Sequence, residues 1–119
     1  MTTNTARTLK YLRDHGWKAG VVERYLSFAK KRQDFLGIID IIAINGKNIL
    51  GVQSCDGSTF AEHDEKILAS PATKLWLASG GKLWLMGWRK VKLFRGSKAM
   101  RWRERIKEYQ LKGGEINDR

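Results

Sequence analysis

The chain has 119 residues, of which 42% are hydrophobic, and its 23 Lys and Arg exceed its 12 Asp and Glu by a net charge of +11. This length and apolar content fit one compact domain and exclude a disordered basic tail, while a single cysteine excludes a disulfide framework and a cysteine-based zinc site. The longest nearly apolar stretch, residues 36–44, is too short to span a membrane, and the N-terminus lacks the apolar run of a secretory signal. We therefore expect a single domain over residues 1–119 that lies in the cytoplasm and does not bind membranes.

The first part of the chain predicts one helix and one strand. Asn4 or Thr5 can cap a helix that runs to about His15, where Gly16 can end it. Residues 17–26 contain β-branched and aromatic side chains typical of a strand.

A β-branched apolar run over residues 34–44 predicts the next strand, because it is too short for an unaided helix. Asn45-Gly46 follows it and is the strongest signal for a two-residue hairpin turn. Residues 47–55 are therefore expected to form the antiparallel partner strand.

The middle of the chain predicts helical structure over residues 60–69 and 72–79, with Pro71 between them and Gly80-Gly81 after them. Together with the strands, these helices predict an α/β fold with a mixed central sheet of four or five strands, flanked by helices.

The last third is basic and rich in tryptophan. Residues 82–88 and 100–107 alternate in the manner of strands, and residues 112–119 are expected to fray. Between residues 82 and 107 there are ten basic residues and one acid, interleaved with aromatic side chains, a mixture that suits binding to nucleic acid. A basic surface without that function is the alternative interpretation. The expected phosphate contacts are Lys90, Lys92, Arg95, Arg101, Arg103 and Arg105.

Asp40 is the most informative residue, because isoleucines surround it on both sides within an expected strand. A buried carboxylate costs several kcal/mol unless cations or hydrogen-bond donors compensate for it. Gln53 on the neighbouring strand can approach Asp40, although a strict two-residue turn would place Asp40 nearer Leu50 or Gly51. The approach therefore requires either a slightly skewed sheet or a wider loop.

Asp40, Gln53 and the upstream acid Glu23 make a plausible site for a hard divalent cation. Such an ion can activate water and stabilise charge on a phosphate. The alternative is a purely structural role, in which Asp40 is hydrogen-bonded to Gln53 or to a buried basic side chain. Asp34 is either a further acid of this site or only the start of the strand.

These segments resemble the PD-(D/E)xK nuclease superfamily, and within it the small Holliday-junction-resolvase-like and phage-encoded members. The resemblance covers about residues 17–79 and is carried by Glu23, by the segment from Asp34 through Asp40 to Ile44, and by Gln53 with its flanking residues. It implies a restriction-endonuclease-like core, Mg²⁺ or Mn²⁺ as cofactor, a homodimer, and a phage-encoded origin in a bacterial host. It also implies that Asp40 and Gln53 are the two strand ligands, with Glu23 as the additional acid.

The sequence departs from the family pattern at two positions. Gln53 stands where the family has Asp or Glu, and Cys55 stands where it has the lysine that assists the attacking water. Some members carry that lysine on the following helix, where Lys66 is the candidate. The alternative for Lys66 is a solvated pair with Glu62, four residues before it.

The function expected from the sequence is a metal-dependent endonuclease acting on DNA, branched or structured DNA included, with Glu23, Asp40, Gln53 and Lys66 as catalytic residues. The pattern does not distinguish DNA from RNA. The alternatives are a nucleic-acid-binding protein that keeps the nuclease fold without cleavage, which the changes at Gln53 and Cys55 favour, and an adaptor or inhibitor that binds another nucleic-acid-handling protein.

Overall fold

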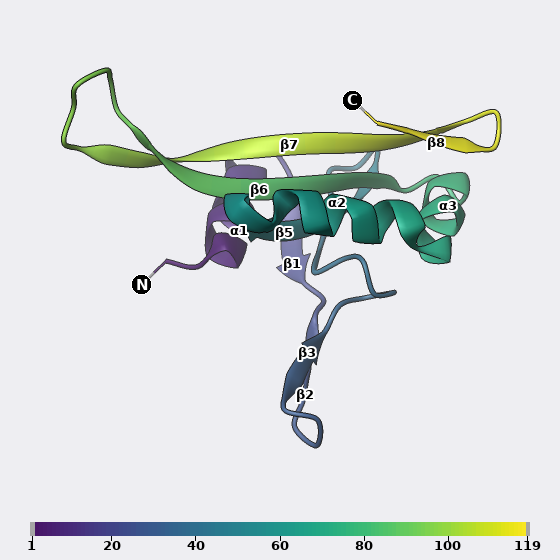
Figure 1. Cartoon of the computed structure of the whole chain (residues 1–119). Coiled ribbons are helices and arrows are strands. Elements are labelled where there is room, and N and C mark those ends of the chain that lie inside the picture. The colour runs from purple at the N-terminus through teal and green to yellow at the C-terminus, as the bar shows by residue number, and fades with distance from the viewer. Residues whose placement is uncertain (1, 119) are drawn as a thin grey trace.

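The computed structural model describes residues 2–118 (Figure 1). Its helices and strands end near residues that cap or break such elements. The helices are α1 (Asn4–Asp14), α2 (Phe60–Ala69) and α3 (Pro71–Ala78), with a short 3-10 helix, η1 (Gly57–Thr59), before α2. The strands are β1 (Lys18–Val21), β2 (Arg24–Leu26), β3 (Lys31–Gln33), β4 (Ile41–Ile44), β5 (Ile49–Asp56), β6 (Lys82–Lys92), β7 (Met100–Lys112) and β8 (Glu115–Asp118).

Six strands form one mixed sheet in the order β1-β4-β5-β6-β7-β8, while β2 and β3 pair separately as a two-stranded ribbon. Strands β5 and β6 are parallel, because η1, α2 and α3 carry the chain back across the sheet between them, and the other neighbours are antiparallel. The predicted α/β class with a mixed sheet is confirmed, although the sheet has six strands and not four or five.

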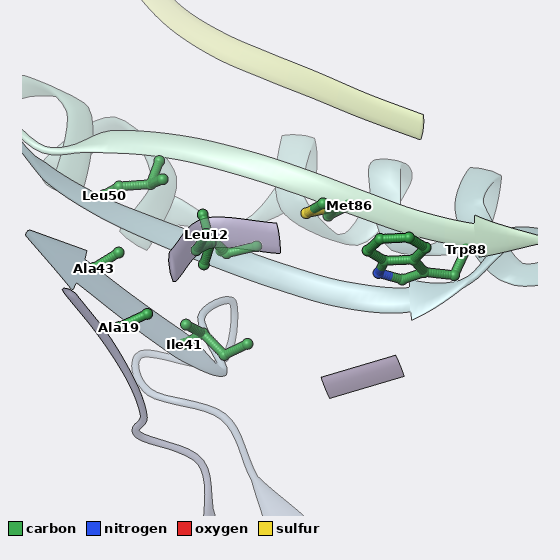
Figure 2. Packing of buried hydrophobic residues seen from close by; sticks show 8 residues of the cluster. Leu12, Ala19, Ile41, Ala43, Leu50, Met86 and Trp88 are labelled. Atoms are coloured by element: carbon green, nitrogen blue, oxygen red, sulfur yellow. The ribbon is translucent and has the colours of Figure 1, made fainter. Parts of the chain in front are cut away.

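Helices cover both faces of the sheet. Leu12 of α1 packs on one face, and Figure 2 shows it among side chains of the central strands, including Ile41, Leu50, Met86 and Trp88. The opposite face packs against α2 and α3 through a second cluster that contains Phe60, Ile67, Leu83, Leu85 and Tyr109. Strand alternation separates the two clusters, since successive side chains point to opposite faces.

Three details of the first half differ from the sequence expectation. Thr3, and not Asn4 or Thr5, caps α1, with its hydroxyl oxygen 3.1 Å from the N–H of Ala6. Residues 17–26 form two strands, of which β1 joins the main sheet and β2 joins the ribbon. Residues 34–40 form a turn, so that the strand predicted over 34–44 is confined to β4.

The C-terminal segment pairs with the sheet instead of fraying. Gly113 and Gly114 adopt φ values of +59° and +82°, which let the chain reverse after β7 and bring β8 against it. Arg119, the end of the segment expected to fray, lies outside the described residues. Within residues 2–118, no helix combines the length and the apolar character needed to cross a bilayer.

Candidate metal centre

A closed turn brings Asp34 and Asp40 to the same place. The N–H of Phe35 donates to the carbonyl of Ile39 at 2.7 Å, and the N–H of Ile39 donates back to Phe35 at 3.0 Å. The residues that flank this bridge, Asp34 and Asp40, therefore leave the turn side by side.

A four-residue loop places Gln53 beside Asp40. Strands β4 and β5 are joined by residues 45–48, and their register pairs Ile41 with Val52. The N–H of Asp40 continues this pattern with a 3.0 Å hydrogen bond to the carbonyl of Val52. The two-residue turn expected from Asn45-Gly46 is thus wrong, and the wider loop is the condition under which Asp40 and Gln53 can meet.

Three carboxylates converge at this point. Glu23 follows β1, Asp34 follows β3 and Asp40 precedes β4, and one side-chain oxygen from each lies within 4.8 Å of the others. Asp40 is buried, and the other two are half-buried. Grouped carboxylate oxygens of this kind are the ligands that hard divalent cations prefer.

The side chain of Gln53 reaches the same cluster from β5 and is only 3% exposed. Its Nε2 donates to Asp34 Oδ2 at 3.2 Å and to Asp40 Oδ2 at 3.3 Å. Its Oε1 is buried and has no hydrogen-bond partner among the described residues. A buried acceptor without a partner costs about 1–3 kcal/mol, and a half-turn of the amide offers this oxygen to a cation bound among the carboxylates.

Burial makes the charge on Asp40 costly. Desolvation raises its pKa to about 7, against the lowering effect of hydrogen bonds from the backbone N–H of Ser54 and from Gln53. The neighbouring charges of Asp34 and Glu23 raise this pKa further. A divalent cation would favour the ionised form of all three acids, so these residues fit a metal ion.

Two basic side chains lie at the edge of the cluster. Lys66 of α2 lies with Nζ 3.5 Å from Asp34 Oδ2, and Arg32 of β3 lies with Nη1 2.7 Å from Glu23 Oε1. Within the described residues the ion pair of Lys66 is therefore with Asp34, and not with Glu62, the alternative partner in the sequence. Lys66 stays about half exposed, so its ammonium group is accessible from solvent.

Comparison of the chain with protein-family models, with curated proteins and with solved structures finds no match of any of the three kinds. The site must therefore be interpreted from its own geometry.

Cys55 stands where the resemblance would place a lysine, and its surroundings are unsuited to that role. It is buried beside Phe60 in the core, and desolvation raises the pKa of its thiol to about 11. The thiol is therefore neutral at physiological pH. Cys55 therefore serves as a small residue of the core.

The expected phosphate contacts divide between two faces of the β6–β7 pair. Arg105 lies opposite Gly87, and its guanidinium stacks 4.1 Å above the Phe60 ring of α2. Gly87 leaves room for the Phe60 ring against β6, because a Cβ there would lie 2.6 Å from that ring. Arg101 and Arg103 share the face of Arg105, as alternate residues of β7.

The two lysines of β6 point to the opposite face, which carries α1. Lys90 lies opposite Trp102 in the register, with Nζ 5.5 Å from the centre of that ring, and Lys92 has the same parity. Arg7 of α1 stacks on the same ring at 3.5 Å. Arg95 lies in the loop between the strands. The six cations therefore do not form one continuous patch.

The structure brings Glu23, Asp40, Gln53 and Lys66 into one neighbourhood, in agreement with the grouping expected from the sequence, and their catalytic roles stay predictions. It adds Asp34, whose role the sequence left open. The sequence did not reveal the convergence of Asp34 with Asp40, because its pattern predicted a strand where residues 34–40 form a turn.

Proposed function

We propose that the chain is a metal-dependent endonuclease that acts on DNA, with Mg²⁺ or Mn²⁺ held by Glu23, Asp34, Asp40 and Gln53. The observation that carries the proposal is the set of three carboxylate oxygens within 4.8 Å of one another, beside a buried Gln53 oxygen that has no hydrogen-bond partner among the described residues. An acidic cluster alone is common in proteins, and the orphaned oxygen beside this one supplies an independent argument for a cation.

The chemistry follows from the kinds of side chain present. A divalent cation at this centre would supply a lowered pKa for a coordinated water molecule and neutralise charge on the phosphate. Lys66, half exposed and 3.5 Å from Asp34, can hold a phosphate oxygen or a water molecule at the rim of the centre. It is the candidate for the role that Cys55 cannot perform.

Arginines on the same side of the sheet support a role in holding the DNA backbone. Gln53 shares its side of β5 with Cys55, which packs in the cluster beneath α2, and Arg105 stacks on Phe60 at the start of α2. The proposal requires a DNA backbone that reaches both these arginines and the acidic centre. Such contacts neutralise phosphates without reading sequence.

A nucleic-acid-binding protein without cleavage is the second candidate, and the buried, neutral thiol of Cys55 favours it. Gln53 is also a neutral amide at a position where the resembled family has a carboxylate. Under this proposal the basic surface binds DNA, and the acidic centre is a structural network.

A cleavage assay separates the two candidates. Purified protein is incubated with branched, duplex and single-stranded DNA in Mg²⁺, in Mn²⁺ and in EDTA, beside Asp40→Asn. Asp14→Asn is the matched control, because Asp14 is an exposed acid of α1 that pairs with Lys10, four residues before it. We expect metal-dependent cleavage by wild type and Asp14→Asn and none by Asp40→Asn. Binding without cleavage at every metal concentration would instead support the second candidate.

A further inference from the structure

The β2–β3 ribbon projects from the body of the protein. Figure 1 shows it extending away from the six-stranded sheet, and its three-residue strands pair with each other and not with that sheet. Almost every residue from Arg24 to Gln33 is exposed, with Leu26 half-buried. A two-stranded ribbon of this size gains little stability from its own pairing. Because its side chains are exposed, packing in the core does not explain which residues it contains.

That composition combines exposed aromatic rings with positive charge. Tyr25 is 61% exposed and Phe28, in the turn at the tip, is 87% exposed. Four basic residues and no acid lie between residues 24 and 33: Arg24, Lys30, Lys31 and Arg32. Aromatic faces that stack on bases, set among cations that attract phosphates, are the combination by which proteins hold single-stranded nucleic acid.

The ribbon starts and ends at the acidic centre. Glu23 immediately precedes it and Asp34 immediately follows it, and Arg32 of the ribbon pairs with Glu23 at 2.7 Å. A cavity of about 240 Å³ is lined by Glu23, Tyr25 and Arg32 together with Val21. Tyr25 therefore lies in the same hollow as one of the three acids.

We propose that the β2–β3 ribbon binds unpaired DNA bases through Tyr25 and Phe28 and so directs single-stranded segments to the acidic centre. In a duplex the faces of the bases are covered by their neighbours in the stack, and only an unpaired base can offer its face to an exposed ring. The cations of the ribbon hold the phosphates that flank that base. This inference deepens the proposed function and rests on it for the role of the acidic centre, but the binding itself requires no cleavage.

The test measures binding in EDTA, where a metal-dependent cleavage activity is silent. Fluorescence anisotropy compares a labelled single strand with the duplex of the same sequence, for wild type, Tyr25→Ala and Phe28→Ala. Leu75→Ala is the matched control, because Leu75 on α3 is also a large apolar side chain, 69% exposed. Thermal melts establish that each variant is folded, as the exposure of these side chains leads us to expect.

We expect each aromatic substitution to weaken binding of the single strand by about fivefold or more, and to leave binding of the duplex and the behaviour of Leu75→Ala nearly unchanged. Equal losses on both DNA forms, no loss on either, or no binding of single strands by wild type would overturn the proposal. If selective loss occurs while wild type cleaves nothing in Mg²⁺ or Mn²⁺, the ribbon proposal stands and the nuclease proposal fails.

Discussion

Gln53 donates a hydrogen bond from Nε2 to Asp40 Oδ2 at 3.3 Å, while its own Oε1 is buried without a partner among the described residues. In this orientation the amide compensates part of the carboxylate charge. The opposite orientation would place Oε1 against the carboxylate of Asp40, and the two oxygens would repel each other unless a cation lay between them. The orientation of this amide therefore reports on the occupancy of the centre.

Replacing Asp40 by Asn is expected to stabilise the metal-free protein at pH 8 by roughly 1–3 kcal/mol. Burial raises the pKa of Asp40 from 3.8 to about 7, so the folded state retains a proton that the unfolded chain releases. The contribution of the Asp40 carboxyl to the free energy of unfolding is fully present below about pH 4 and is lost as the pH rises through 7. Urea unfolding in EDTA should therefore show similar stabilities for the two proteins near pH 4 and a growing advantage for Asp40→Asn toward pH 8.

Asp56→Asn serves as the control for that measurement. Asp56 is exposed, and hydrogen bonds from Ser58 lower its pKa, so its contribution is present above about pH 4 and is lost in acid. An Asp40→Asn variant that is less stable than wild type at pH 8 would mean that the carboxylate is needed to hold the fold.

Gln53→Glu adds a carboxylate where Nε2 now lies 3.2 Å from Asp34 and 3.3 Å from Asp40. We expect a lower melting temperature in EDTA, because like charges then meet in a buried site, and a larger upward shift on adding Mg²⁺ than wild type shows. Thermal melts with and without millimolar Mg²⁺ measure both effects. A variant destabilised equally in both conditions would argue for a metal-free structural network.

Lys66→Met should abolish or strongly reduce cleavage and leave the fold intact, because the lysine side chain is half exposed and contributes only a partly screened ion pair with Asp34. Lys74→Met, on the exposed surface of α3, is the matched control. The measurement is the single-turnover cleavage rate with saturating DNA. Equal rates for Lys66→Met and Lys74→Met would remove Lys66 from the catalytic set.

Combined replacement of Arg101, Arg103 and Arg105 by Ala should weaken DNA binding similarly for unrelated sequences. The slope of log affinity against log salt should fall by about 0.9 for each phosphate of duplex DNA that the variant no longer neutralises. Lys47→Ala, in the exposed loop after β4, should keep the wild-type slope. A triple variant with an unchanged slope would show that this face does not bind the DNA backbone.

The sequence predicted the helices whose ends are marked by capping or helix-breaking residues. Helix α2 has the predicted bounds, and α3 begins at Pro71, a residue suited to the first turn of a helix. The turn between Asp34 and Asp40 escaped prediction, because Leu36 adopts a left-handed φ of +57° that few leucines adopt. An apolar β-branched pattern cannot reveal such a residue, and so the convergence of the two acids was seen only in the structure.

Strands β3 and β8 were missed for different reasons. Lys31–Gln33 is polar and lacks the alternation of a half-buried strand, since neither of its faces packs on the core. Strand β8 follows Gly113-Gly114, a pair that favours a hairpin turn, but the segment after it was expected to fray because it ends the chain. The candidate residues were thus predictable by type, and their distances depended on loops that sequence patterns do not specify.

The most direct test of the metal centre is the anomalous difference map of a crystal soaked in Mn²⁺. We expect a peak in contact with carboxylate oxygens of Asp34 and Asp40, with the amide of Gln53 turned so that Oε1 faces the ion. Mn²⁺ bound elsewhere, or no peak at this cluster while Nε2 of Gln53 still donates to Asp40, would contradict the presence of a metal centre here.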